Sequence, residues 1–230
     1  MRPLVVGFCA LIAALSSITP AWAETLNTPD ELAKSRLFMG YLQGNVRNHL
    51  VIDFIAATDS KYGQACNQPY LIRIVSITVE RPVLIGPGSL APDDGVWSEK
   101  LSAQRCGRSS VVNIMFVAGE QPVPRPVELL PGMTAASPQL MRDALPMVTS
   151  GALRTAEKKT PSARNCNQPR VTDTSAPTVI GDKRSEPNSL VGRTWIETWS
   201  FDVCGTQANV DVTFSENLIT KGTNFAVGLN

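Results

Sequence analysis

Two glutamates stand in the same setting, each two residues after a tryptophan and a few residues before a Cys-Gly pair. The stretches read WSEKLSAQRCG at 97–107 and WIETWSFDVCG at 195–205. A β-strand sends alternate side chains to opposite faces, so each glutamate shares a face with its tryptophan. That face is apolar, and in the second stretch it also carries Trp199, Phe201 and Val203. A carboxylate there needs partners, because burying an unpaired charge costs a great deal of free energy.

Two kinds of chemistry would explain these carboxylates. In the structural interpretation, which we favour, an arginine or a set of backbone N–H groups satisfies each carboxylate. The arginines near them in the sequence are Arg73, Arg81, Arg105 and Arg193. In the functional interpretation, Glu99 and Glu197 converge and act as the acid/base pair of a secreted hydrolase. The aromatic side chains either pack in a core or line a ligand cleft. The candidate ligand-binding residues are Trp97, Glu99, Trp195, Glu197 and Trp199.

Most other catalytic and cofactor chemistry is missing from the sequence. His49 is the one histidine, so a zinc site built on several histidines is excluded. The cysteines lack the Cys-x-x-Cys spacing of structural zinc or redox sites. No nucleophile elbow, phosphate-binding loop, dinucleotide fingerprint or EF-hand loop occurs. We therefore expect no metal and no cofactor, and a non-catalytic protein rather than an enzyme.

The first 23 residues have the three parts of a secretory signal peptide. Arg2 gives a charged start, an apolar run follows from Leu4 to Leu15, and Ala-Trp-Ala precedes a cleavage site after Ala23. The run is too short for the roughly 20 residues of a membrane anchor, and no other segment is long and apolar enough to span a membrane. Cleavage removes Arg2 and leaves a net charge of zero, which offers nothing to nucleic acid. We expect a periplasmic or secreted protein.

The similarity between the two halves of the chain extends beyond the Trp-x-Glu stretches. CNQP occurs at 66–69 and 166–169, PVLIG at 82–86 resembles PTVIG at 177–181, and VNIMF at 112–116 resembles VDVTF at 210–214. All the matches occur in the same order, which favours duplication of a small domain over convergence. Cys9 leaves with the signal peptide, and an even number of cysteines in an exported chain predicts disulfides. The repeat favours the pairs Cys66–Cys106 and Cys166–Cys204.

The predicted fold is α+β, with two tandem homologous modules at 24–118 and 137–230 and a proline-rich linker at 119–136. Each module begins with a short helix and continues as an antiparallel sheet that ends in a Trp-x-Glu/Cys-Gly hairpin. Thr28 and Glu31 predict a capping box for the first helix, and Pro146 predicts that the second ends after two turns. Apolar, β-branched residues predict strands at 49–57 and 71–79, and a poorer edge strand at 170–180. The polar segments 154–164 and 181–189 are expected to be loops.

These observations predict a non-catalytic binding or assembly protein of the bacterial cell envelope. Its partner would be an envelope protein or an apolar small molecule, with no role for nucleic acid. The sequence leaves the oligomeric state open. The alternative function is the secreted hydrolase that uses Glu99 and Glu197, and its test is whether the two carboxyl groups lie close together in a shared cleft.

Overall fold

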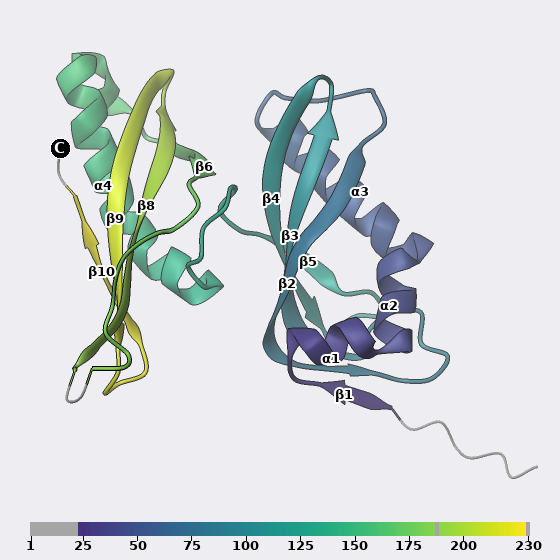
Figure 1. The fold of residues 1–230 in the computed structure, drawn as a ribbon. Helices are drawn as coiled ribbons and strands as arrows, with labels where there is room; N and C mark the ends of the chain where they lie inside the picture. Colours follow the sequence, from purple (N-terminus) through teal and green to yellow (C-terminus); the bar gives the residue numbers. More distant parts are fainter. Residues whose placement is uncertain (1–22, 187–188, 229–230) are drawn as a thin grey trace, which may run out of the picture.

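The computed structural model describes residues 23–186 and 189–228. This part of the chain contains two five-stranded antiparallel sheets, each covered by helix (Figure 1). The fold is therefore α+β, as the sequence predicts. Except for Ala23, the predicted signal peptide lies outside the described residues. Within the described ranges, no helix has both the length and the apolar character needed to cross a bilayer.

Three helices cover the first sheet: α1 (Pro29–Lys34), α2 (Arg36–Gln43) and α3 (Asn45–Lys61). Thr28 caps α1, because the backbone N–H of Glu31 donates to its hydroxyl over 3.2 Å. The predicted strand at 49–57 is wrong, since these residues lie within α3. The buried residues of α3 recur every fourth position, which places them on one helical face against the sheet. They are Arg47, Val51, Ile55 and Asp59.

The first sheet has the strand order β1-β2-β3-β4-β5. Its strands are β1 (Glu24–Leu26), β2 (Leu71–Ile85), β3 (Asp94–Arg105), β4 (Arg108–Ala118) and β5 (Arg125–Glu128). The inner face of β3 is buried, and there Trp97 stacks on Phe116 and meets the edges of Phe38 and Tyr41 from α2. We call α1–α3 with β1–β5 the first module. The opposite, outer face of its sheet carries polar side chains such as Ser98 and Lys100.

The second module comprises α4 (Pro138–Lys159), a 3₁₀ turn (Pro161–Asn165) and the second sheet. The strands of this sheet are β6 (Arg170–Thr174), β7 (Thr178–Asp182), β8 (Val191–Val203), β9 (Thr206–Asn217) and β10 (Thr223–Val227). The order is β10-β9-β8, and both β6 and β7 pair with the edge of β8 that faces away from β9. The edge position expected for 170–180 agrees with this order, but the structure has two strands there, β6 and β7, in place of the single strand predicted.

Two predictions for this module are wrong because α4 continues past Pro146. The helix runs to Lys159, so most of the predicted loop at 154–164 is helix or 3₁₀ turn. Pro146 lies on the exposed side, where it removes one backbone hydrogen bond. The opposite side buries Ala144, Val148 and Ala152, and this packing holds the helix together across the proline. The predicted loop at 181–189 begins within β7, and 187–188 lie outside the described residues.

A two-residue Cys-Gly turn connects β3 to β4, and another connects β8 to β9. Cys106 and Gly107 have φ values of 46° and 72°, and Cys204 and Gly205 have values of 49° and 88°. Positive φ at both central residues is the geometry of a type I′ turn, which matches the twist of the strands that it joins. Each turn cysteine forms a disulfide, Cys66–Cys106 in the first module and Cys166–Cys204 in the second.

The proline-rich segment at 119–136 is more than a linker. It contains β5, which pairs antiparallel with β4 and completes the first sheet. The part after β5, residues 129–136, is here called the connector, and it is hydrogen-bonded on both sides. Towards the first module, the backbone N–H of Gly132 donates to Val111 O over 3.0 Å. Towards the second module, the N–H of Met133 donates to Thr174 O over 2.7 Å.

Candidate functional site

Glu99 is completely buried and is satisfied by two side chains. Arg47 of α3 forms an ion pair with it, and the indole N–H of Trp97 donates to Glu99 Oε1 over 3.1 Å. Arg47 is not among the four arginines suggested by the sequence, because the residues that follow it favour a strand and the helix that carries Arg47 to Glu99 is not apparent. Arg81 instead pairs with Asp94 on the surface.

A second buried ion pair joins α3 to β3. Arg105, at the end of β3, binds both carboxylate oxygens of Asp59, and its Nη2 lies 2.8 Å from Asp59 Oδ1. Asp59 lies twelve residues after Arg47, which is roughly 18 Å along a helix. Their partners Glu99 and Arg105 lie six residues apart, which is roughly 20 Å along a strand. The two spacings match, so both pairs form at once when α3 lies along β3.

Glu197 is also completely buried, but it is satisfied without a cation in contact. Its Oε1 accepts from the indole N–H of Trp195 over 2.9 Å and from the backbone N–H of Ala135 over 2.8 Å. Its Oε2 accepts from the indole N–H of Trp199 over 3.2 Å. The first module has Leu101 where the second has Trp199, and it supplies an arginine instead of the second indole. The difference between the two stretches therefore reflects how each carboxylate is satisfied.

The structure places the five candidate ligand-binding residues in two hydrophobic clusters. Trp97 and Glu99 lie in the first module, and Trp195, Glu197 and Trp199 lie in the second. Each of the five side chains is at most 3% exposed. Such burial favours the structural interpretation of both carboxylates. An acid and a base must reach the substrate, and neither glutamate is exposed to do so.

A cavity with a volume of about 970 Å³ lies between the two modules. Its apolar wall is built from four parts of the chain: the first sheet, the connector, α4 and β6. The apolar side chains include Met115, Val127, Leu129, Leu130, Met141, Leu145 and Val171. This volume is at the upper end of the range for small-molecule sites. We call this cavity the cleft.

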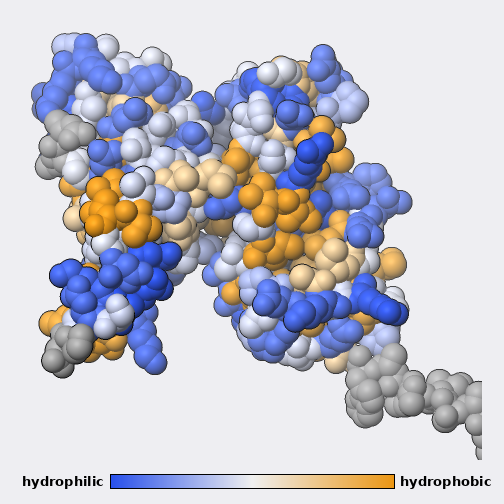
Figure 2. All heavy atoms as spheres, in the orientation of Figure 1, coloured by the Kyte–Doolittle hydropathy of each residue, from blue (hydrophilic) through white to orange (hydrophobic). Residues whose placement is uncertain are grey.

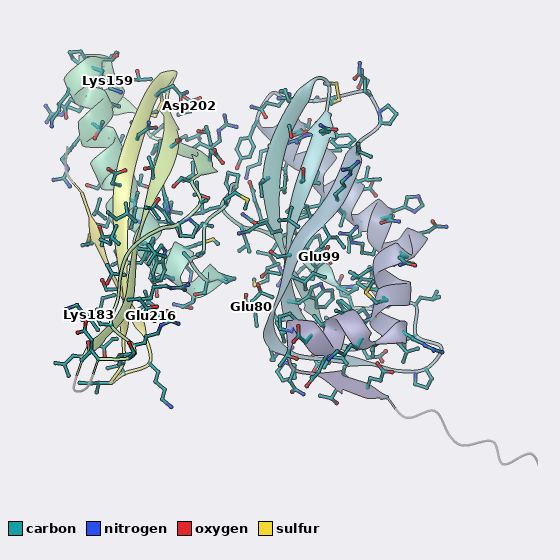
Figure 3. All side chains as sticks on the ribbon, in the orientation of Figure 1. Glu80, Glu99, Lys159, Lys183, Asp202 and Glu216 are labelled. Atoms are coloured by element: carbon teal, nitrogen blue, oxygen red, sulfur yellow. A yellow bond between two sulfur atoms is a disulfide. The ribbon has the colours of Figure 1, made fainter. Side chains whose placement is uncertain are left out.

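Charged and aromatic groups line one part of the cleft. The Tyr62 hydroxyl and Lys61 Nζ, at the end of α3, each donate to Glu128 over 3.0 Å. The Arg170 guanidinium of the second module lies over the Tyr62 ring, 4.5 Å from its centroid. This cation–π contact bridges the two modules. Figure 3 shows Asp202 on the side of the second module that faces the first, and Arg170 lies 3.9 Å from its carboxylate.

A smaller cavity of about 230 Å³ lies against the outer face of the first sheet. Most of the residues that line it are of polar type, including Glu80, Ser98, Lys100 and Asn113. Figure 3 shows Glu80 on the side of the first module that faces the second. Burial raises the pKa of Glu80 above its ordinary value and lowers the pKa of Lys100 below its ordinary value. Titratable groups with shifted pKa values in a cavity mark it as a candidate site.

The connector fixes the distance between the modules at these cavities. The Asn113 side-chain amide donates to Leu130 O over 2.7 Å and to Gly132 O over 2.9 Å. Lys100 Nζ donates to Thr134 O over 2.8 Å. On the other side, the N–H of Ala135 binds Glu197 as described above. One short segment is therefore tied to both sheets, and the walls of the cleft are held in place.

The cleft residues are absent from the sequence-based candidates because they come from both modules. None of the tryptophans predicted to bind a ligand lines either cavity, and Glu99 lines only the smaller one. One sequence feature does indicate the cleft: the apolar residues Val127, Leu129 and Leu130 lie close together in a segment whose prolines predict a linker. Figure 2 shows apolar surface over the strands of the first module, beside the second module.

Comparison with known proteins adds no assignment to this geometry. Among the described residues, no group of three or more histidine, cysteine, aspartate or glutamate side chains is placed to hold a metal ion. No protein-family model, curated protein or solved structure matches the chain.

Proposed function

We propose that this chain is an exported, non-catalytic binding protein whose cleft receives an apolar small molecule. The observation that carries the proposal is the cavity of about 970 Å³ between the modules, with apolar walls supplied by both of them. Apolar surface left open to water costs free energy, and a bound apolar ligand would remove that cost. The connector holds the walls apart, so little rearrangement is needed to admit a ligand.

Export is supported by the signal-like first 23 residues and by the two disulfides. Disulfides persist in the periplasm and outside the cell, whereas the cytosol keeps thiols reduced. Cleavage after Ala23 would make Glu24, the first residue of β1, the new N-terminus. We therefore propose a periplasmic or secreted location.

We further propose that the two modules descend from one duplicated domain. Support comes from the ordered sequence matches and from the same elements in the same order: a helix, a disulfide cysteine, a Trp-x-Glu strand and a Cys-Gly turn. Both turns use a left-handed cysteine, a conformation that non-glycine residues seldom adopt. In this view, the cleft arose when the two copies were fixed side by side by the former linker.

The hydrolase alternative finds little support in the site geometry. Glu99 is neutralised by Arg47, and Glu197 accepts three hydrogen bonds inside a different hydrophobic cluster. A working acid/base pair needs both carboxyl groups in one accessible cleft. We accordingly assign both glutamates a role in folding.

The binding function can be tested with Nile red, an uncharged dye that fluoresces in apolar surroundings. We expect saturable binding of one dye per chain. Leu145→Trp, which fills the cleft from α4, should weaken dye binding at least about tenfold, a loss of roughly 1.4 kcal/mol. The matched control is Met147→Trp on the same helix, where the side chain is 52% exposed and outside the cleft. Equal dye affinity in the two variants would refute the cleft as the binding site.

A further inference from the structure

The cleft and the smaller cavity share part of their walls. Glu80, Leu129, Pro138 and Met141 line both of them. The apolar cleft therefore adjoins a polar recess, the name used below for the cavity of about 230 Å³. At roughly 30 Å³ for each water molecule, the recess has room for about seven waters or one small polar group.

The recess presents both donors and acceptors from the outer face of the first sheet. Thr78 pairs with Ser98 across β2 and β3, and Ser76 pairs with Lys100 one step further. These four residues line the recess. Hydroxyl groups both donate and accept hydrogen bonds, so this surface suits a ligand group that does the same.

The charges around the recess balance one another without touching. Lys100 gives one hydrogen bond to Thr134 O and experiences the field of the buried Glu197 carboxylate. Glu80 Oε1 accepts from the Ser98 hydroxyl over 3.2 Å. No ion pair joins Lys100 to Glu80 in the described ranges. The Glu99 side chain lies on the inner face of the sheet, where Arg47 neutralises it.

This arrangement disfavours a charged ligand group of either sign. An anionic group beside Lys100 would also lie near the Glu80 and Glu197 carboxylates, and like charges repel one another. A cationic group beside Glu80 would lie near the Lys100 ammonium. An uncharged group that bears hydroxyls or an amide meets neither repulsion and can use the hydroxyls, Lys100 and Glu80 as partners.

We propose that the ligand is a single-chain amphiphile with an uncharged hydroxyl- or amide-bearing head. Its apolar chain lies in the cleft, and its head occupies the polar recess. This inference rests on the proposed binding function and adds the chemical class of the ligand. The cleft volume of about 970 Å³ is suited to one small molecule rather than to a folded partner.

The test is displacement of bound Nile red by three amphiphiles of equal chain length at about pH 7, below their micelle-forming concentrations. They are 1-monolauroylglycerol, dodecanoate and dodecylammonium. We expect the uncharged monolauroylglycerol to displace the dye at concentrations at least about tenfold lower than the two charged compounds. Glu80→Gln should improve displacement by dodecanoate, and Lys100→Met should improve displacement by dodecylammonium, each about tenfold.

Glu216→Gln is the control, because this carboxylate lies on β9 and lines neither cavity. It should leave all three displacement curves unchanged. Equal displacement by the three compounds, or preference for a charged one, would overturn the inference about the head while leaving the binding function in place. Displacement by none of them, with Nile red still bound in the cleft, would overturn the amphiphile class. Absence of saturable Nile red binding would overturn the binding function itself.

Discussion

Replacing Arg47 with methionine should strongly destabilise the first module. The methionine fills most of the space of the arginine stem, so the main loss is the positive charge beside Glu99. The side chains of this pair are 5% and 0% exposed. Water therefore cannot solvate Glu99 in the variant. Of the two side chains that bind Glu99 in the original protein, Arg47 would be lost and only the Trp97 indole N–H would remain.

The expected loss is about 3–5 kcal/mol of unfolding free energy, the range for removal of one partner from a buried ion pair. Adding Glu99→Gln to Arg47→Met should restore roughly 2 kcal/mol. The glutamine carries no charge and can still accept the hydrogen bond from Trp97. One of its amide N–H groups would remain buried without a partner, so the double variant should stay about 1–3 kcal/mol less stable than the original protein.

Urea unfolding followed by tryptophan fluorescence measures these changes. Hydrogen exchange of the α3 and β3 amides, with β8 as an internal reference, assigns them to the first module. Arg81→Met is the matched control, because the Arg81–Asp94 pair is about half exposed and should contribute at most about 1 kcal/mol. The reasoning fails if Arg47→Met costs no more than Arg81→Met, or if the double variant is no more stable than Arg47→Met alone.

Three further perturbations test other parts of the structure. Replacing Cys166 and Cys204 with serine opens a loop with a sequence separation of 38 residues and should cost about 4 kcal/mol by the chain-entropy relation, seen as a lower urea midpoint measured without reductant, so that Cys66–Cys106 stays intact. Gly132→Ala should disturb the packing of the modules, because its φ is +101° and a Cβ would lie 2.3 Å from backbone atoms of β6; small-angle scattering should show a larger particle. In contrast, Gly88→Ala, at φ +85° with open space around it, should cost only about 1–2 kcal/mol and leave the particle size unchanged. Because burial raises the pKa of Glu80, folding favours its protonated form and stability falls as pH rises through that pKa; Glu80→Gln should raise Tm near pH 7 and give no such gain near pH 3.

The inward face of the Trp-x-Glu strands could be predicted from the sequence because alternation along a strand is a local property. Trp97 and Glu99 are both buried, as are Trp195, Glu197 and Trp199. The disulfides could be predicted because the repeated motifs place one cysteine before the strands and one at the hairpin turn of each copy. These predictions required no knowledge of how distant segments pack.

The helix α3 could not be identified from residue types alone. Val51, Ile52, Phe54 and Ile55 are apolar or β-branched and favour a strand when taken as a run. Arg47, Val51, Ile55 and Asp59 are spaced four residues apart, as expected for one face of a helix. Two of them are charged, however, so the sequence shows no continuous apolar stripe. Their burial makes sense only once Glu99 and Arg105 are known to lie opposite.

The cleft was missed for a different reason. Its walls come from parts of the chain up to about 140 residues apart, such as Tyr62 at the end of α3 and Cys204 at the β8–β9 turn. Nothing in the local pattern of either module shows which surfaces face each other. That arrangement depends on the connector, whose backbone hydrogen bonds to both sheets cannot be read from its prolines.

The two buried ion pairs between α3 and β3 also set the polarity of the helix. Arg47 near the start of α3 meets a glutamate, and Asp59 near its end meets an arginine. Turned end for end, the same helix would bring Arg47 next to Arg105 and Asp59 next to Glu99, two like-charge encounters in a dry interior. Hydrophobic contacts alone distinguish poorly between the two orientations, since Val51 and Ile55 near the middle of the helix would be buried in both. The opposite charges at the two ends of α3 therefore favour one orientation of the helix on the sheet and disfavour the reversed one.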